Sequence, residues 1–237
     1  MAEAQPRPVL ITGAGRRIGL ALAHHFLNQQ QPVIVSYRQH YPSIDTLRDA
    51  GAVCLQADFS SDDGILTFAE AVKAQTSGLR AIIHNASDWM AEKPGVPLST
   101  VISRMMQIHV HAPYLLNHAL ESLLRGFGHA ASDIIHITDY VVERGSDKHI
   151  AYAASKAGLL SLARTLSAEL LPHGIRVNGL SPGPVRTPAL DKLGLSAQAL
   201  SDLQEEIKNL VPLGRMGTPQ ELANAALYLA SDESSYV

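Results

Sequence analysis

Residues 10–19 read LITGAGRRIG, an apolar run that ends in a glycine-containing turn and is followed at once by two arginines. A turn that joins a strand to a helix points backbone N–H groups at an anion, and glycines let a pyrophosphate approach closely. Gly13, Gly15 and Gly19 suit this task, although their spacing departs by one residue from the common G-x-G-x-x-G pattern. Because a strand is expected before the turn and a helix after it, a dinucleotide-binding loop is favoured over a turn without a ligand.

The rest of the chain alternates between short apolar runs and stretches with helical spacing. Such alternation predicts a parallel sheet covered on both faces, because each parallel connection crosses over through a helix. Strands are expected over residues 8–12, 32–36, 52–56, 79–84, 133–138 and 175–181. Helices are expected over residues 17–30, 43–50, 61–76, 99–125 and 152–171. We therefore predict a doubly wound α/β fold, a Rossmann fold, with its ligand at the carboxyl ends of the strands.

The whole chain, residues 1–237, is predicted to form a single domain that binds the cofactor. A chain of 237 residues with 46% hydrophobic content can bury a full core, and no repeat or linker interrupts the pattern. Residues 182–198 follow the last expected strand, so we expect them to overhang the site as a substrate lid.

Charge and composition exclude several classes of protein. The formal net charge of −3 and the scattered basic residues offer no face for nucleic acid. No run of about 18 apolar residues and no charged leader occur, so we expect a cytoplasmic protein without a membrane partner. The single cysteine, Cys54, cannot form an internal disulfide. The histidines show no metal constellation with carboxylates at ligand spacing, so no metal is expected.

The end of the second expected strand bears on the choice of cofactor. An NAD-binding unit places a carboxylate there to bind the ribose, whereas an arginine accommodates a 2′-phosphate. Residues 35–40 read VSYRQH and contain Arg38 but no carboxylate, while Arg17 leaves the first helical turn nearby. Two guanidinium groups can clamp a phosphate through charge-assisted hydrogen bonds. We therefore predict NADPH rather than NADH, the alternative being that these arginines are solvated surface residues.

The catalytic signal lies in YAASK, residues 152–156, which open the helix after the fifth strand. Tyr152 and Lys156 are one helical turn apart and share a face, so the ammonium can lie near the phenol. A phenol with an ordinary pKa of about 10 becomes a useful proton donor near neutral pH only if a cation favours the phenolate. Lys156 and an oxidised nicotinamide are expected to provide that charge.

Four motifs in order make the chain resemble the short-chain dehydrogenase/reductase family: TGAGRRIG (12–19), HNAS (84–87), YAASK (152–156) and SPGPVRT (181–187). The resemblance implies that Asn85 supports the central strand and the cofactor site, and that Asp58 lies at the adenine ring. It further implies that Lys156 binds the nicotinamide ribose. The other residues that it places at the cofactor are Ile18, Tyr37, Pro182, Gly183 and Thr187.

Three departures from the general family pattern resemble pteridine reductases, most closely over residues 8 to about 157. Arg17 replaces the usual middle glycine. Asp139 stands 13 residues before Tyr152, in the place of the catalytic serine, which implies proton delivery to a pterin ring nitrogen by both groups. Trp89 stands where an aromatic ring stacks the pterin. The resemblance implies hydride transfer from NADPH to a dihydropterin, with dihydrofolate as a second substrate; otherwise Trp89 is a core aromatic and Asp139 a cap.

Two other functions stay open. Beyond about residue 160 the chain resembles the general family, including reductases of 3-oxoacyl thioesters, as expected of a divergent member or a hybrid of two relatives. A regulatory protein that binds NADPH without turnover is the alternative from another class, because His109 occupies the family's usual asparagine position. The sequence also ends at SDESSYV, without the family's closing strand. Family analogy implies a homo-tetramer built partly on the helices at 99–125 and 152–171.

Overall fold

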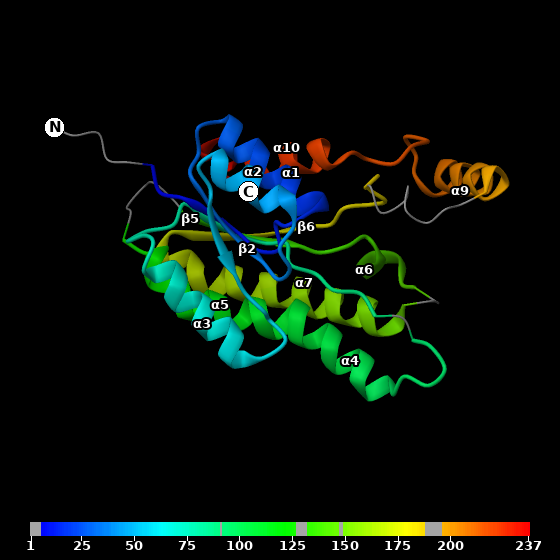
Figure 1. Cartoon of the computed structure of the whole chain (residues 1–237), viewed down its shortest axis with the longest axis horizontal. Coiled ribbons are helices and arrows are strands. Elements are labelled where there is room, and N and C mark those ends of the chain that lie inside the picture. Colours follow the sequence, from blue (N-terminus) through cyan, green and yellow to red (C-terminus); the bar gives the residue numbers. More distant parts are fainter. Residues whose placement is uncertain (1–5, 91, 127–131, 147–148, 188–195) are drawn as a thin grey trace.

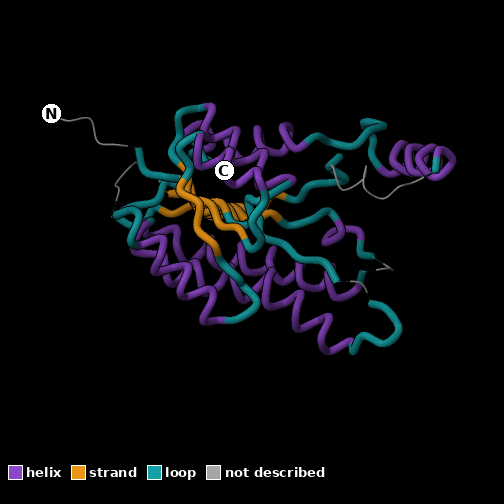
Figure 2. The backbone as a smooth tube through the Cα atoms, in the orientation of Figure 1, coloured by secondary structure: helices purple, strands orange, loops and turns teal. Residues whose placement is uncertain are grey.

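The computed structural model describes residues 6–90, 92–126, 132–146, 149–187 and 196–237. Its centre is one open sheet of six parallel strands in the order β3-β2-β1-β4-β5-β6, drawn in orange in Figure 2. The strands are β1 (Val9–Ile11), β2 (Val33–Tyr37), β3 (Val53–Gln56), β4 (Ala81–His84), β5 (Ser132–Ile137) and β6 (Ile175–Leu180). The predicted doubly wound fold is confirmed, and every predicted strand is present within two residues of its expected bounds.

Helices cover both faces of the sheet (Figure 1). One face carries α1 (Arg17–Asn28), α2 (Pro42–Asp49) and α10 (Pro219–Leu229). The other face carries α3 (Asp62–Lys73), α4 (Leu98–Met106), α5 (Ala112–Leu120) and α7 (Ile150–Leu170). Shorter helical elements are α6 (Val141–Arg144) and the 3₁₀ turns Glu121–Leu123, Leu171–His173 and Asp232–Ser234.

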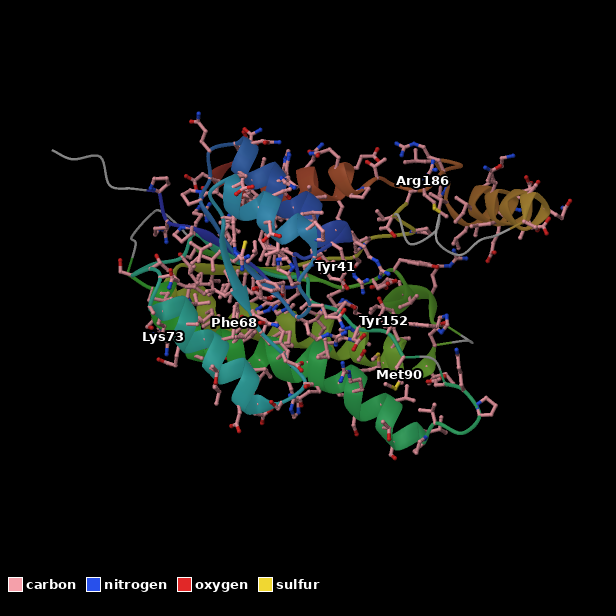
Figure 3. The ribbon with its side chains drawn as sticks, in the orientation of Figure 1. Tyr41, Phe68, Lys73, Met90, Tyr152 and Arg186 are labelled. Carbon is pink, nitrogen blue, oxygen red and sulfur yellow. The ribbon has the colours of Figure 1, made fainter. Side chains whose placement is uncertain are left out.

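The core has two parts because successive residues of a strand point to opposite faces of the sheet. Val9 and Ile11 of β1 pack in the cluster that includes Phe26 of α1. Leu10 packs in the opposite cluster with Phe68 of α3, which is labelled in Figure 3. Both clusters are built from buried apolar side chains, which pack against the sheet and hold in place the residues that follow its strands.

The turn after β1 depends on two of its glycines. Gly13 has a φ of +71°, and a Cβ atom there would lie 2.7 Å from the Cα atom of Ala86. A Cβ atom on Gly19 would lie 2.4 Å from the carbonyl oxygen of Gly13. Neither approach leaves room for a side chain, so the turn, the start of α1 and the segment after β4 can meet only with glycine at these positions.

Several helices differ from the sequence-based expectation. The predicted helix at 99–125 is interrupted by a π-helical turn, Gln107–His111, between α4 and α5. The helices α9 (Ala197–Leu210) and α10 were not predicted. Of the predicted lid at 182–198, residues 188–195 lie outside the described residues, and the last two residues begin α9. Within the described chain, no helix is both long and apolar enough to cross a membrane.

Candidate active site

A cavity of about 550 Å³ lies at the carboxyl ends of the strands. After each of the six strands, a residue within two positions of the strand's end lines the cavity, as expected for the ligand site of a doubly wound sheet. Every cofactor residue predicted from the sequence lines this cavity: Gly13, Gly15, Arg17, Ile18, Gly19, Tyr37, Arg38, Asp58, Asn85, Lys156, Pro182, Gly183 and Thr187. Asp139 and Tyr152 line it as well, and Tyr152 is labelled in Figure 3.

The side chain of Asn85 anchors the glycine turn. Its Nδ2 atom donates hydrogen bonds to the carbonyl oxygens of Thr12, at 2.9 Å, and Gly13, at 3.1 Å. The backbone N–H of Gly13 donates to Ser36 Oγ at 2.9 Å. At the start of α1, Arg16 provides no side-chain cap, and the described first turn contains no acidic residue. The uncapped N–H groups of this turn can therefore donate hydrogen bonds to an anion such as a pyrophosphate.

Arg38 is held by a carboxylate that sequence analysis missed. Its Nη1 atom lies 3.2 Å from Asp88 Oδ2, which also receives Arg104 Nη2 at 2.6 Å. Burial raises the pKa of Asp88, but hydrogen bonds from Arg104, the backbone of Trp89 and Arg38 outweigh burial and lower it overall. Asp88 lies in the loop after β4 and Arg104 lies 16 residues later on α4, so no local sequence pattern predicts that Asp88 pairs with Arg38 and Arg104.

Tyr152 and Asp139, both predicted to be catalytic residues, are joined by a hydrogen bond. Tyr152 Oη donates to Asp139 Oδ2 at 2.7 Å, and Asp139 Oδ1 accepts from the backbone N–H of Val141 at 3.0 Å. Burial and the charge of Asp139 raise the pKa of Tyr152. This is the reverse of the lowering that we expected from Lys156, because burial disfavours the charged phenolate and the carboxylate of Asp139 disfavours it further. The phenol therefore stays protonated near neutral pH.

Lys156 is almost completely buried, with 3% of its surface exposed. Its Nζ atom donates to the carbonyl oxygen of Ile137 at 2.9 Å and lies 5.8 Å from the centroid of the Tyr152 ring. Burial lowers the pKa of Lys156 to about 8, although the charge of Asp139 opposes the shift. Lys156 therefore lines the cavity with its ammonium near the ring of Tyr152, as the one-turn spacing in YAASK predicts.

The pKa of Lys156 predicts the pH dependence of the enzyme. We expect kcat/KM for NADPH to fall as the pH rises through about 8, because the side chain loses its proton and its charge above that value. This ratio reports the ionisation of the free enzyme. In Lys156→Arg the guanidinium stays charged, so the decline near pH 8 should disappear even if activity is lower. The same decline in both proteins would show that another group titrates.

The predicted substrate residue Trp89 does not line the cavity. Its side chain is 54% exposed and meets the ring of His149 edge to face, with the centroids 5.3 Å apart. Its neighbour Asp88 does line the cavity, so Trp89 lies at the edge of the site rather than in the core.

Tyr37 lines the cavity but is mostly buried, and its hydroxyl accepts a hydrogen bond from Arg48 at 3.0 Å. Among the described residues, no group of three or more metal-ligating side chains is present.

Comparisons with known proteins find similarity over most of the chain. The family described as enoyl-(acyl carrier protein) reductase matches residues 13–237. A dihydromonapterin reductase from Klebsiella pneumoniae is 71% identical over 221 residues, which cover 89% of this chain and 90% of the relative. The alignment omits about a tenth of the chain, so the similarity extends past residue 160, farther than the motifs indicated.

Two solved structures are also similar. A protein described as a short-chain dehydrogenase/reductase family member is 28% identical with a TM-score of 0.78, over 98% of this chain and 92% of its own. A protein from Beutenbergia cavernae, described as an NAD(P)-dependent gluconate 5-dehydrogenase with bound NADP, is 26% identical with a TM-score of 0.82, over 99% of this chain and 93% of its own. The motifs, the six-stranded sheet and these similarities agree, and the chain belongs to the short-chain dehydrogenase/reductase family.

Proposed function

We propose that the protein is an NADPH-dependent reductase that adds a hydride and a proton across the C=N bond of a dihydropterin, with dihydromonapterin as the first candidate substrate. The observation that carries the proposal is the hydrogen bond between Tyr152 and Asp139 in the cavity. A carboxylate accepts hydrogen bonds from the amino and ring N–H groups of a pterin, a task for which serine is poorly suited. The similarity to the Klebsiella dihydromonapterin reductase supports the same substrate class.

The residues that line the cavity fit the cofactor. The uncapped start of α1 suits the pyrophosphate, and Arg17 and Arg38 suit the 2′-phosphate. Lys156 is proposed to hold the nicotinamide ribose and Asp58 to lie at the adenine. Pro182, Gly183 and Thr187 are proposed to hold the nicotinamide. When bound, NADPH supplies the hydride.

The chain's own groups are proposed to deliver the proton. Tyr152 keeps a proton on Oη and releases it to the ring nitrogen, while Asp139 holds the phenol in position and binds the pterin N–H groups. Lys156 supplies positive charge behind the tyrosine. Trp89, exposed at the edge of the site, is proposed to stack on the pterin.

Arg38→Ala tests the cofactor preference. We expect KM for NADPH to rise about 10- to 100-fold, because hydrogen bonds between charged groups contribute about 1.5–3 kcal/mol. KM for NADH should stay within about twofold, since NADH has no 2′-phosphate for the guanidinium to bind. Steady-state kinetics with both cofactors measure the ratio.

Arg104→Ala is the matched control for this measurement. It removes an arginine from the same carboxylate, Asp88, but Arg104 does not line the cavity. Its ratio of NADPH to NADH efficiency should equal that of the wild type. If Arg38→Ala leaves the ratio unchanged, or if both variants change it equally, Arg38 does not read the 2′-phosphate.

The proposed activity is tested by NADPH oxidation with dihydromonapterin, dihydrobiopterin, dihydrofolate and an acetoacetyl thioester. Turnover of the pterins that is lost in Asp139→Ser supports the proposal. Turnover of the thioester alone identifies a carbonyl reductase instead. Tight NADPH binding without turnover of any substrate identifies a protein that binds the cofactor without using it.

We further propose that residues 1–237 act as one domain, with residues 182–198 as the substrate lid, in a homo-tetramer in the cytoplasm. Leu98, Ile102 and Tyr114 leave large apolar surfaces exposed on α4 and α5, where the interface is predicted. Light scattering during size-exclusion chromatography measures the number of subunits.

A further inference from the structure

His109 is a buried histidine for which the proposed reaction has no stated use. It lies in the π-helical turn between α4 and α5, and only 1% of its surface is exposed. Its ring meets the Tyr152 ring edge to face, with the centroids 5.4 Å apart and the planes at 87°. A π-helical turn inside a longer helix costs regular hydrogen bonding and often marks a functional site. Here the turn brings an imidazole against the proposed proton donor.

Both ring nitrogens of His109 have partners from distant parts of the chain. Nε2 lies 2.8 Å from Oγ of Ser87, in the segment after β4 that lines the cavity. Nδ1 lies 2.7 Å from Oγ of Ser155, on α7. Ser155 Oγ in turn lies 2.7 Å from the carbonyl oxygen of Tyr152 and donates to it. A continuous path of hydrogen bonds therefore connects the cavity wall to the backbone of Tyr152.

The directions of these bonds follow from the number of protons available. A serine hydroxyl has one proton, and Ser155 uses it on the Tyr152 carbonyl. Ser155 Oγ must then accept from Nδ1–H of His109. In a neutral ring the other nitrogen, Nε2, is an acceptor, so Ser87 donates to it. Burial and the nearby charge of Lys156 lower the pKa of His109 to about 3, which keeps the ring neutral, and the hydrogen bond to Ser155 then selects the tautomer with the proton on Nδ1.

Another buried histidine shows that burial alone does not produce such an arrangement. His136 on β5 is fully buried and stacks on His84, with the centroids 4.8 Å apart. Neither of its nitrogens has a hydrogen-bond partner among the described residues. His109 differs because both of its nitrogens are used and both connect to residues around the proposed site.

We infer that His109 is a positioning residue, which holds the segment after β4 and the start of α7 in one arrangement so that Tyr152 faces the cavity. The inference rests on the proposed role of Tyr152. His109 does not touch the reacting atoms; it acts through Ser155 on the tyrosine backbone and through Ser87 on the cavity wall. Small displacements of a positioned group are costly, since a shift of about 1 Å can lower a rate about 10²-fold.

The test compares His109→Phe with His136→Phe, the same substitution at a second buried histidine. We expect His109→Phe to slow hydride transfer about 10- to 100-fold at saturating NADPH and dihydropterin. The dissociation constant of NADPH should change less than about threefold, since the cofactor's phosphates bind elsewhere in the cavity. Stopped-flow absorbance measures the transfer rate, cofactor fluorescence the binding, and thermal unfolding the stability.

Two further variants separate positioning from folding. Asn carries its amide nitrogen as many bonds from Cβ as Nδ1 is in histidine, so His109→Asn should recover part of the rate through Ser155. Ser155→Ala should slow transfer as His109→Phe does, and the double variant should be no slower than the slower single variant, since linked groups act as one unit.

The outcomes distinguish this inference from the proposed function. Wild-type turnover identifies the substrate first, and the variants are then assayed with whichever substrate the wild type reduces. A loss in His109→Phe no larger than in His136→Phe, or additive losses in the double variant, would overturn the positioning role. A wild type that reduces no substrate would overturn the proposed function and this inference with it.

Discussion

Tyr152→Phe is expected to lower turnover of the dihydropterin by about 10²–10⁴-fold, the range typical for removal of a general acid. The change deletes only the hydroxyl that donates to Asp139 at 2.7 Å. Phenylalanine fills the same space beside His109, so the fold and the NADPH dissociation constant should be preserved. Steady-state kinetics measure the loss of turnover, and titration of cofactor fluorescence measures binding.

Tyr140→Phe is the matched control for this experiment. Tyr140 also lines the cavity, but its hydroxyl is not the one that donates to Asp139. We expect this variant to keep most of its activity. If the two variants lose activity equally, or if Tyr152→Phe retains wild-type turnover, the proton comes from another group and the proposed mechanism is wrong.

Asp133→Asn is expected to lower the free energy of unfolding by about 3–5 kcal/mol, the usual cost of removing one partner from a buried ion pair. Only 1% of Asp133 is exposed, and it pairs with Arg80 and with Arg176, the latter at 2.7 Å. Arg176 also donates to the backbone after α10, including the carbonyl oxygen of Ser231 at 3.0 Å. Without the carboxylate, two largely buried cations, Arg80 just before β4 and Arg176 in β6, would repel each other at the amino ends of the strands.

Asp232→Asn provides the comparison. Asp232 pairs with the same Arg80 at 3.1 Å, but its side chain is 83% exposed. An exposed ion pair contributes about 0–1 kcal/mol, so this variant should be nearly as stable as the wild type. Urea denaturation of the three proteins measures the difference. Equal stability of Asp133→Asn and Asp232→Asn would mean that the buried network does not stabilise the fold.

Much of the candidate site could be predicted from the sequence because it lies just after strands or in the first turns of the helices that follow them. Gly13 and Gly19 are required by backbone contacts at the end of β1, and Arg38 directly follows β2. Parallel strands end at the same edge of the sheet, so these segments converge whatever their separation in sequence. Trp89 was predicted to contact the substrate but does not line the cavity. One aromatic residue in a loop has no periodic pattern that would predict which way its side chain points.

The helices were harder to predict where packing decides them. The helical pattern at 99–125 did not predict the π-helical turn at Gln107–His111. Within this turn, His109 contacts Ser155 on α7, and sequence periodicity does not predict such a tertiary contact. The helix α10 begins with a capping box at Thr218 and Glu221, with Pro219 between them. That signal is local and could have been found, because an Ser/Thr residue followed three positions later by Glu is typical of a helix start.

The sequence by itself determined the strands, the glycine turn and the one-turn spacing of Tyr152 and Lys156, because backbone sterics and hydrophobic periodicity act over a few residues. Only the tertiary structure decided the ionisation of the site. The pKa of Tyr152 is raised and that of Lys156 lowered by burial, and Asp139, two residues after β5, accepts a hydrogen bond from the tyrosine on α7. Desolvation and charge interactions depend on which groups are buried together when α7 packs against the sheet, and no local sequence pattern determines that packing.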